Sequence, residues 1–437
     1  MYDDDSIADT ENVIKAISIL NKDYNDHIAI AFPIPNSKAI FDHARKNNSS
    51  EEQQEKVKGN VNDTVIIIFT SGTTSGINKG VRISSRSLFI QSKAKTIQPC
   101  NYNKGTNMMG SICIPPLFHI GGISSILGTI LVGGCLIFPY STKPTFDAKT
   151  VLSCISHPFR KNCVSSTSNF IKITNEYVNT LVVVPAMLHS LMEENQKHQN
   201  IAYPSIKLIL VGGQSMTIPQ RKRAKHIFPN AKFVQTYACT EATSSITFAD
   251  LSNDNDINSD EHGDYVGVTP PHIQIKIFPM NDNDTNIENV LTNKQVGIIA
   301  TRGIHVMNGY WKRANTQNNN KNLSPNEWLL TSDLGYITHQ KINHNNKSLL
   351  YFCGRKHDVI RTGGETVFAL EIENILQKLK DISSCAVIPL HDERLGEIIT
   401  AAIVLSSSSD YNTTAYLSIN VNDTRAYKYV KANDAFT

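Results

Sequence analysis

The sequence predicts an α/β protein whose main part is a largely parallel sheet sandwiched between helices. Short, continuous runs of apolar and β-branched residues predict strands that are covered on both faces. After Ile273 the pattern changes to closely spaced short strands with turns between them, which predicts a smaller β-rich subdomain. A final, smaller α/β piece is expected to begin near Asp358.

The elements follow in order along the chain. The predicted strands of the first part are "HIAIAF" (27–32), "TVIIIF" (64–69), "TLVVVP" (180–185), "IKLILVGG" (206–213) and "KFVQTYA" (232–238). The predicted helices lie in "VPAMLHSLMEENQKH" (184–198) and "TIPQRKRAKHIF" (217–228), and "ISSILGTILVGGCLIF" (123–138) predicts a buried helix that leads into a strand. That last stretch is too short to span a bilayer and two glycines interrupt it, so no transmembrane segment is expected.

The later elements are shorter and the segments between them more polar. Strands are predicted in "IQIKIF" (273–278), "VGIIATRG" (296–303), "EWLLTSDLGYIT" (327–338) and "SLLYFCG" (348–354). The final piece has a predicted helix, "ALEIENILQKLKD" (369–381), and two predicted strands, "SSCAVIPL" (383–390) and "IITAAIVL" (398–405). Residues 156–177 and 315–326 lack apolar content and are predicted to be mobile surface loops.

Composition excludes several classes of protein. The chain has 437 residues, 40% of them hydrophobic, and a net charge of +3, which gives no reason to expect a nucleic-acid partner. Its eight cysteines include no CxxC pair, which favours reduced thiols inside a cell. The acidic N-terminus has no apolar core of a secretory signal, and "NDAFT" at the C-terminus matches no known address. The composition does not indicate an oligomeric state.

One stretch points to phosphate binding. "FTSGTTSGINKGV" (69–81) follows a predicted buried strand and combines glycines with short hydroxyl side chains and one lysine. Backbone N–H groups, hydroxyls and a positive charge together form a cradle for an anion such as polyphosphate. The stretch is not a Walker A motif, because Lys79 is followed by Gly80. A flexible Ser/Gly turn is the alternative interpretation of this stretch alone. The residues assigned to phosphate binding are Thr70, Ser71, Gly72, Thr73, Thr74 and Lys79.

The stretch resembles the phosphate-binding motif of the adenylate-forming superfamily, which includes acyl-CoA synthetases, firefly luciferase and the adenylation domains of peptide synthetases. There is one extra residue before Lys79, and Asn78 replaces the usual proline. Five further segments resemble motifs of this superfamily, in the expected order: "PPLFHIGGI" (115–123), "VGGQ" (211–214), "QTYACTEA" (235–242), "LLTSDLGYI" (329–337) and "GRKHDVIRTGGETVFALEIE" (354–373).

The resemblance implies catalytic roles for four residues. His119 would lie beside the carboxylate pocket, and Lys79 would neutralise phosphate charge. Thr240 would contact the phosphate, and Glu241 would hold Mg²⁺, a cation that prefers oxygen ligands.

It also implies how the rest of the nucleotide is bound. Tyr237 would stack on adenine, and Asp333 would accept hydrogen bonds from the ribose hydroxyls. The backbone along adenine would come from Gly212, Gly213 and Gln214.

The last motif implies a hinge between two domains. The nucleotide-binding domain would comprise residues 1–353, and a small α+β domain, incomplete in this chain, would comprise residues 354–437. Arg355 would contact the ribose, and Gly363 and Gly364 would lie where the small domain meets the pantetheine arm of CoA.

The implied reaction joins a small carboxylic acid to CoA at the expense of ATP. Segments between the motifs look most like the plant and algal 2-succinylbenzoate–CoA ligases of phylloquinone synthesis, over roughly residues 64–405. A 4-coumarate or a medium- or long-chain fatty-acid ligase is the alternative. A third hypothesis is a catalytically impaired nucleotide- or acyl-binding protein, and an unrelated phosphate-loop ATPase is disfavoured by the order of the motifs.

The two ends depart from the superfamily pattern. Only 69 residues precede Thr70, and no PxTxxGKxxR segment, which carries the adenylation lysine, follows residue 405. We therefore expect a chain that is truncated at both ends. The resemblance implies a plastid or a peroxisome, and the cytoplasm is the alternative.

Overall fold

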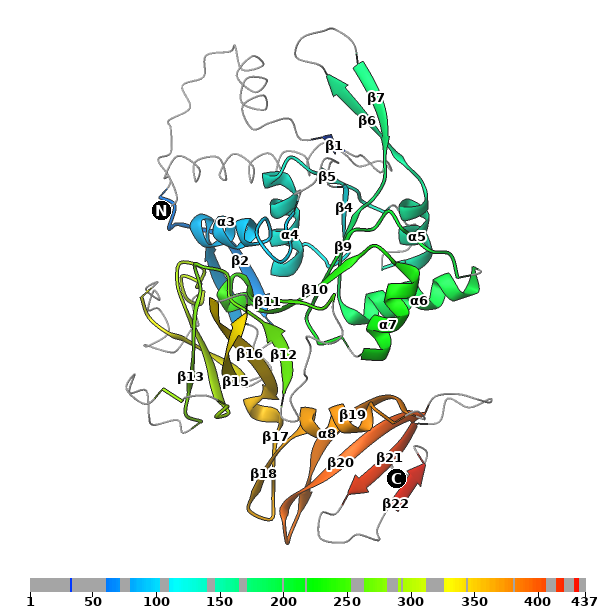
Figure 1. Ribbon diagram of the computed structural model, residues 1–437. Helices are drawn as coiled ribbons and strands as arrows, with labels where there is room; N and C mark the ends of the chain where they lie inside the picture. The colour runs from blue at the N-terminus through cyan, green and yellow to red at the C-terminus, as the bar shows by residue number, and fades with distance from the viewer. Residues whose placement is uncertain are drawn as a thin grey trace. The chain divides into compact units, whose positions relative to one another are not determined.

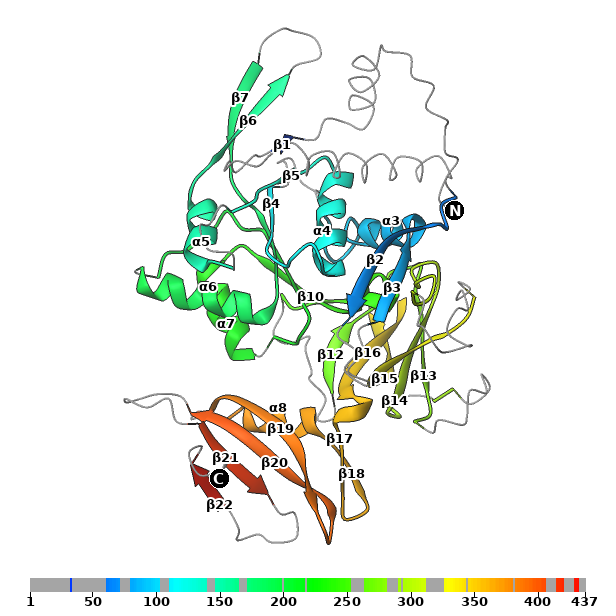
Figure 2. The ribbon, with the colours of Figure 1, turned by 180° about the vertical axis from the view of Figure 1, so that it is seen from behind.

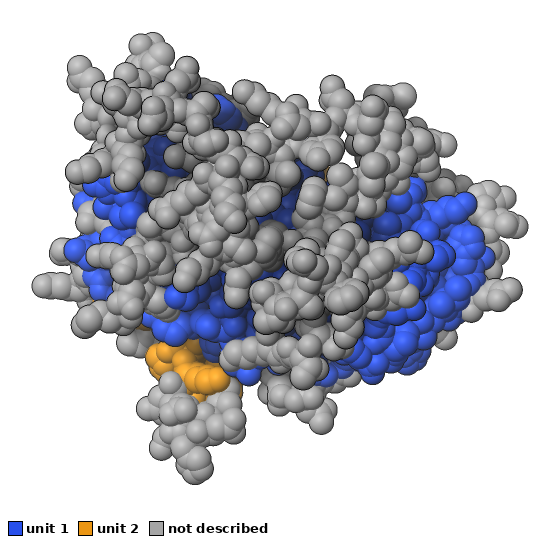
Figure 3. Space-filling model, turned by 90° about the horizontal axis from the view of Figure 1, so that it is seen from above, with its two compact units in different colours: residues 1–256, 266–274, 301–329 blue, residues 257–265, 275–300, 330–437 orange. Residues whose placement is uncertain are grey.

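The computed structural model divides into two compact units (Figure 3). Unit 1 comprises residues 1–256, 266–274 and 301–329, and unit 2 comprises residues 257–265, 275–300 and 330–437. The structure describes residues 32–33, 60–70, 79–102, 110–139, 146–164, 171–198, 200–216, 218–252, 263–280, 290–291, 294–311, 326–342, 345–379, 382–405, 414–419 and 428–431.

A seven-stranded sheet forms the centre of unit 1, in the order β1-β5-β4-β8-β9-β10-β11. The five strands from β5 to β10 in this order are parallel, and antiparallel strands pair at both edges. The parallel centre confirms the predicted fold class. The strands are β1 (Phe32–Pro33), β4 (Gly110–Cys113), β5 (Cys135–Leu136), β8 (Thr180–Val183), β9 (Leu208–Gly212), β10 (Lys232–Cys239) and β11 (Ser244–Asp250). Most of residues 27–32, predicted as a strand, lie outside the described part of the chain.

Helices lie on both faces of this sheet. α3 and α4 lie on one side of the strands, and α5, α6 and α7 lie on the other (Figures 1 and 2). The helices predicted after Val184 and Met216 are α6 and α7, and the predicted buried helix within residues 123–138 is α4. The bounds are α3 (Ser85–Ala94), α4 (Ile120–Leu131), α5 (Ala148–Ser156), α6 (Pro185–Lys197) and α7 (Ile218–Ile227). Among the described helices, none is long and apolar enough to cross a membrane.

The apolar run 64–69 forms a strand but does not join the main sheet. β2 (Thr64–Thr70) pairs antiparallel with β3 (Lys79–Ser84) in a separate two-stranded sheet. The few residues that connect β2 to β3 are too short for the crossover that parallel neighbours require. The prediction of a strand was therefore right and its placement in a parallel sheet was wrong.

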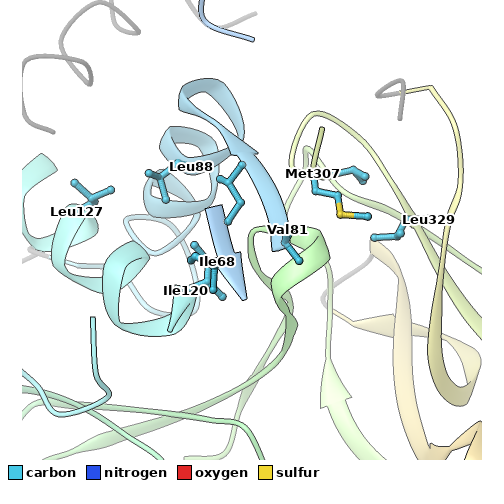
Figure 4. Packing of buried hydrophobic residues seen from close by; sticks show 9 residues of the cluster. Ile68, Val81, Leu88, Ile120, Leu127, Met307 and Leu329 are labelled. Atoms are coloured by element: carbon cyan, nitrogen blue, oxygen red, sulfur yellow. The ribbon is translucent and has the colours of Figure 1, made fainter. Parts of the chain in front are cut away.

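A cluster of buried apolar residues anchors the β2–β3 hairpin (Figure 4). Ile68 and Val81 of the hairpin pack with Leu88 of α3, Ile120 of α4 and Met307. Because Ile120 follows His119 and Met307 belongs to the segment 306–311, this packing positions three stretches of chain that carry candidate site residues.

One predicted loop of unit 1 is a hairpin instead. Within residues 156–177, β6 (Phe159–Val164) pairs antiparallel with β7 (Ile171–Glu176). A polar segment can satisfy its own backbone N–H and C=O groups by pairing with itself, without an apolar core. The prediction of a loop was therefore wrong there. Most of the second predicted loop, at 315–325, lies outside the described residues.

The β-rich subdomain is a five-stranded sheet in the order β12-β16-β15-β14-β13, which confirms its prediction. Its longest strands, β15 and β16, pair antiparallel along most of their length. The strands are β12 (Asp264–Gly267), β13 (Gln274–Phe278), β14 (Gly297–Arg302), β15 (Leu329–Ile342) and β16 (Asn345–Arg355).

The final piece combines one helix with a sheet, as predicted. α8 packs on the sheet through a cluster that includes Ile360, Ala369 and Ala401. The sheet has the order β18-β17-β20-β21-β22, with β19 also paired to β20. The bounds are β17 (Val359–Thr362), β18 (Glu365–Phe368), α8 (Ala369–Leu376), β19 (Ile382–Asp392), β20 (Gly396–Leu405), β21 (Thr414–Ile419) and β22 (Lys428–Lys431).

Candidate active site

The predicted site residues of unit 1 follow the carboxyl ends of the parallel strands. His119 comes after β4, Gly212 to Gln214 come at the end of β9, and Tyr237 to Glu241 come at the end of β10. The carboxyl ends of parallel strands all lie on one side of the sheet, at the ends of the strands, and α/β proteins bind ligands there. The fold therefore brings three of the predicted motifs to the carboxyl ends of the strands.

The turn after β9 is held close to β10. Gly212 lies opposite Thr236, and a Cβ at Gly212 would come within 3.2 Å of Thr236 Cγ2. Gly213 has φ +89°, which glycine adopts without strain. The buried side chain of Gln235 accepts a hydrogen bond of 2.9 Å from the backbone N–H of Met216. These contacts leave Gly213 and Gln214 exposed at the edge of the sheet.

The end of β10 carries the next motif. Tyr237 is buried, and the register of β10 against β11 shifts between Tyr237 and Ala238. After the strand, Thr240 and Glu241 begin a single 3₁₀ turn, η1 (Thr240–Ala242). The bulge and the turn end the strand, and they leave Thr240 and Glu241 half-buried.

The β2–β3 hairpin closes the predicted phosphate loop. Thr70 and Lys79 are opposite each other in the hairpin, and Thr70 Oγ1 donates a hydrogen bond of 3.4 Å to the Lys79 carbonyl. Of the loop residues proposed to bind phosphate, Ser71, Gly72, Thr73 and Thr74 lie outside the described residues. The structure thus places the two ends of the loop.

A segment far along the chain lies beside β3. Asn308 N–H donates to the Arg82 carbonyl (2.8 Å), and Trp311 N–H donates to the Gly80 carbonyl (2.6 Å). Val81 and Tyr310 form an antiparallel bridge between these two bonds. This pairing brings Tyr310 next to the residues that close the loop.

Tyr310 connects Lys79 with Glu241. Its hydroxyl donates a hydrogen bond of 3.0 Å to Glu241 Oε1, and Lys79 Nζ lies 5.4 Å from the centroid of its ring. The backbone fixes Glu241 as well, because Met307 N–H donates to its carbonyl (2.9 Å). One acidic and one basic side chain are therefore held around one aromatic ring, from three separate parts of the sequence.

Glu241 fits the role of a ligand for a hard cation. Its carboxylate is half-buried and accepts the one Tyr310 bond, and a carboxylate has more acceptor positions than that. Mg²⁺ is usually held by one or two carboxylates together with substrate phosphates. Accordingly, no group of three His, Cys, Asp or Glu side chains that could hold a metal occurs among the described residues.

His119 is exposed at the start of α4. It occupies the N-cap position without a side-chain capping bond, and its ring centroid lies 4.7 Å from that of Phe118. The Phe118 side chain is 71% exposed. An exposed aromatic residue and a histidine at a helix start are suited to contact a bound molecule, although nothing in the structure assigns His119 a catalytic step.

Unit 2 holds the other predicted nucleotide contacts. Asp333 on β15 lies opposite Arg355 on β16, with 3.9 Å between Asp333 Oδ1 and Arg355 Nε. Thr331 Oγ1 accepts a hydrogen bond from Asp333 N–H (3.2 Å) and donates one to the Ile299 carbonyl (2.8 Å). The sheet therefore sets the direction of Asp333, and Arg355 extends from the end of its partner strand.

Gly363 and Gly364 form the tight turn between β17 and β18. Their φ angles are +58° and +89°, and Thr362 and Glu365 close the turn. Two consecutive residues with positive φ suit a two-residue hairpin turn that favours glycine. This turn gives a structural reason for both glycines that is independent of CoA.

The sequence analysis missed two residues that position others. Tyr310 was recognised only as part of a similar segment, and Thr331 as part of a predicted strand. No local sequence pattern reveals their roles, because their hydrogen-bond partners, Glu241 and Ile299, lie far away in the sequence.

The fold and the residues at the sheet edge define a class of protein. Phosphate-bearing ligands need positive charge, backbone N–H groups and, with a metal, a carboxylate. Unit 1 offers a positive charge at Lys79 and a carboxylate at Glu241, near the carboxyl ends of parallel strands, where α/β proteins bind ligands. The class is that of nucleotide-binding α/β enzymes.

The chain belongs to the AMP-binding enzyme family, whose model matches residues 6–311. It is 33% identical, over 356 residues, to the chloroplastic/peroxisomal 2-succinylbenzoate–CoA ligase of Arabidopsis thaliana, covering 78% of this chain and 56% of that protein. It is 26% identical to a 4-coumarate–CoA ligase-like protein of the same plant, covering 87% of this chain and 60% of that protein.

Solved structures share the fold. One is the o-succinylbenzoate CoA synthetase of Bacillus subtilis in complex with an acyl-adenylate intermediate, with a TM-score of 0.58 and 24% identity. The match covers 80% of this chain and 61% of that one. The chain thus spans less than two thirds of the length of these relatives.

Proposed function

We propose that this protein is an AMP-forming acid–CoA ligase. In the first step the carboxylate of the acid attacks the α-phosphate of ATP, pyrophosphate leaves, and an acyl-adenylate forms. In the second step the thiol of CoA attacks the acyl carbon and AMP leaves. The observation that carries the proposal is the Lys79–Tyr310–Glu241 arrangement. It holds the Lys79 ammonium and the Glu241 carboxylate around the Tyr310 ring, where the phosphate loop ends at Lys79.

The residues of unit 1 would share the first step. Lys79, Thr70 and the loop residues Ser71, Gly72, Thr73 and Thr74 would hold the phosphates, and Thr240 would contact the α-phosphate. Preorganised charges at the reacting oxygens lower the barrier of such a transfer. Glu241 would hold Mg²⁺, which would neutralise charge on the phosphates. Tyr237 and the backbone of Gly212, Gly213 and Gln214 would bind adenine, and His119 would face the acid.

Unit 2 would supply the remaining contacts. Asp333 and Arg355 would bind the ribose, and residues 354–437 would act as a small domain that turns about a hinge near Arg355. Gly363 and Gly364 would then meet the pantetheine arm of CoA.

We further propose 2-succinylbenzoate as the acid. The relative with 33% identity is named for this acid, while the 4-coumarate–CoA ligase-like relative is 26% identical. A 4-coumarate or fatty-acid ligase is therefore the second candidate. Because the more similar relative is chloroplastic/peroxisomal, a plastid or a peroxisome is the proposed compartment.

The test is a ligation assay on the full chain. The protein is incubated with ATP, Mg²⁺, CoA and 2-succinylbenzoate, 4-coumarate, octanoate or palmitate, and acyl-CoA and AMP are measured by mass spectrometry. Glu241→Gln keeps the shape of the side chain and removes the charge. Glu193→Gln on α6, whose side chain is 56% exposed, is the matched control. We expect 2-succinylbenzoyl-CoA from the wild type and the control only.

Other outcomes decide between the remaining hypotheses. Preference for 4-coumarate or a fatty acid would replace the proposed acid but keep the reaction. ATP binding without any acyl-CoA or acyl-adenylate would contradict the ligase and support the catalytically impaired binder.

A further inference from the structure

A lysine that contacts two elements of the candidate site, α4 and β11, is completely buried. Lys95, directly after α3, is 1% exposed. Its Nζ donates hydrogen bonds to Ser124 Oγ (2.9 Å) and to Ser244 Oγ (3.4 Å), and the two hydroxyls lie 2.8 Å apart. An ammonium group has three protons to donate, and these two hydroxyls are its hydrogen-bond acceptors among the described residues.

Among the residues that the structure describes, no acidic side chain pairs with this lysine. None of the ion pairs among the described residues involves Lys95. The thiols of Cys100 and Cys113 would attract it if they were ionised, but burial raises the pKa of both to about 12, so they stay neutral. Burial lowers the pKa of Lys95 to about 8, which leaves most of it protonated at neutral pH. A buried and unpaired ammonium is costly unless an anion joins it.

The hydroxyls that hold Lys95 belong to the elements of the candidate site. Ser124 is on α4, the helix that begins after His119, and Ser244 begins β11, directly after the turn that carries Glu241. Thr243 and Ser244 have φ angles of +54° and +129°, which residues other than glycine rarely adopt. Such strain is found where a side chain must be held for a ligand.

The turn of α4 before Ser124 has open space on one side. A Cβ added at Gly121, one turn before Ser124 on α4, would meet no atom within 4 Å. Ser124 Oγ is itself 3.4 Å from the Gly121 carbonyl, so one hydroxyl contacts both this turn of α4 and the lysine. At the next position, by contrast, a Cβ at Gly122 would lie 2.6 Å from the Pro116 carbonyl oxygen.

We propose that Lys95, Ser124 and Ser244 bind a second carboxylate of the acid substrate, one that is not activated, and so select dicarboxylic acids. The proposal rests on the proposed ligase function, in which the acid lies between His119 and Glu241. The second carboxylate enters along the Gly121 side of α4 and accepts hydrogen bonds from the remaining ammonium N–H and from the serine hydroxyls. An acid without this group leaves the buried ammonium unpaired and binds less well.

The test compares two acids that differ by one carboxylate, 2-succinylbenzoate and 4-oxo-4-phenylbutanoate. Binding of each to the full chain is measured by calorimetry in the presence of AMP, and ligation is measured in parallel. The wild type is expected to bind the dicarboxylate roughly 10- to 100-fold more tightly, as expected for a charged hydrogen bond. Lys95→Met is expected to abolish this preference by weakening only the dicarboxylate, mainly through KM. Lys93→Met, on the same helix, is the control and keeps the preference.

The outcomes separate this proposal from the ligase proposal. Acyl-CoA formation with the same acid preference in the wild type and Lys95→Met would overturn the subsite and keep the ligase. Loss of the preference in Lys95→Met without any acyl-CoA in the wild type would keep the subsite and contradict the ligase. Binding of neither acid by the wild type would overturn the subsite. If Lys95→Met does not fold, Ser124→Ala decides: a decrease of roughly 3- to 10-fold for the dicarboxylate alone supports the subsite, and an equal change for both acids contradicts it.

Discussion

The Tyr310 hydroxyl donates a hydrogen bond of 3.0 Å to Oε1 of Glu241, across 69 residues of sequence. The backbone pairing of residues 308–311 with β3 puts Tyr310 there, and the same pairing brings its ring to Lys79. A hydrogen bond to a charged group is stronger than one between neutral groups, and this one fixes the orientation of the Glu241 carboxylate.

Tyr310→Phe is therefore expected to impair catalysis while leaving the fold intact. Loss of a hydrogen bond to a charged group corresponds to roughly a 10- to 100-fold decrease in kcat/KM for ATP. The Mg²⁺ concentration needed for half-maximal rate should increase in the same variant, because Glu241 is the proposed ligand. Steady-state kinetics at several Mg²⁺ concentrations measures both.

Tyr203→Phe is the control for that experiment. This variant also removes a hydroxyl that donates to a side chain, Asn195 Oδ1 at 3.3 Å. Tyr203, however, lies between α6 and β9, and its ring centroid is 5.8 Å from that of Phe228, directly after α7. An equal loss of activity in both variants would argue against a role of Tyr310 at Glu241.

Replacing either of the two adjacent glycines at the start of α4 with alanine should change the stability in opposite directions. Gly121→Ala meets open space and is expected to raise the free energy of unfolding by up to about 1 kcal/mol, through helix propensity. Gly122→Ala would press on the backbone of Pro115 and Pro116 and should lower it by about 1–3 kcal/mol. Urea unfolding measures both, and a destabilised Gly121→Ala would show that the space beside α4 is filled.

Stability should depend on pH through Lys95. Its pKa is lowered from 10.5 to about 8 by burial, so between these values the unfolded chain binds a proton that the folded protein has released. The free energy of unfolding then rises with pH, by about 1 kcal/mol between pH 8 and 9, and Lys95→Met removes this rise.

The neighbouring Cys100, Cys113 and Tyr102 change the stability in the opposite direction as pH rises. Their contribution must be subtracted from the measured pH dependence. Burial raises the pKa of Cys100 and Cys113 from 9.0 to about 12, so the unfolded chain loses these protons first and stability falls above pH 9. Tyr102 acts in the same direction at higher pH, because burial raises its pKa too. The wild type and Lys95→Met both contain these groups. The difference between their free energies of unfolding in urea therefore reports the contribution of Lys95 alone. A difference that does not change between pH 8 and 9 would contradict the prediction.

Arg355→Ala should weaken ATP binding and leave the stability nearly unchanged. The Arg355 side chain is 55% exposed and its contact with Asp333 is 3.9 Å, so its removal is expected to change the free energy of unfolding by less than about 0.5 kcal/mol. If Arg355 contacts the ribose, KM for ATP should rise about 10-fold or more. Arg361→Ala, which removes a hydrogen bond to Thr366 on the other strand of the β17–β18 hairpin, is the control and should leave KM unchanged.

The local elements were largely predictable from the sequence. Continuous apolar runs identified β8, β9 and β10, and helical stretches identified α6 and α7, because burial on both faces leaves a local pattern. The motif order also gave Glu241, Tyr237 and Asp333 their proposed roles, which stay predictions. Two local predictions failed because pairing is a relation between segments: β2 joined β3 instead of the main sheet, and residues 159–176 formed a hairpin.

By itself the sequence determined the elements, the family resemblance and the residue types available for phosphate, metal and ribose binding. The tertiary structure alone decided which of them meet. Only the pairing of residues 308–311 with β3 brings Tyr310 to Glu241, and only the packing of α3, α4 and β11 leaves Lys95 buried with two hydroxyls and, among the described residues, no acidic partner. The physical reason is that hydrogen bonding and desolvation depend on distance in space, which spacing along the chain does not encode.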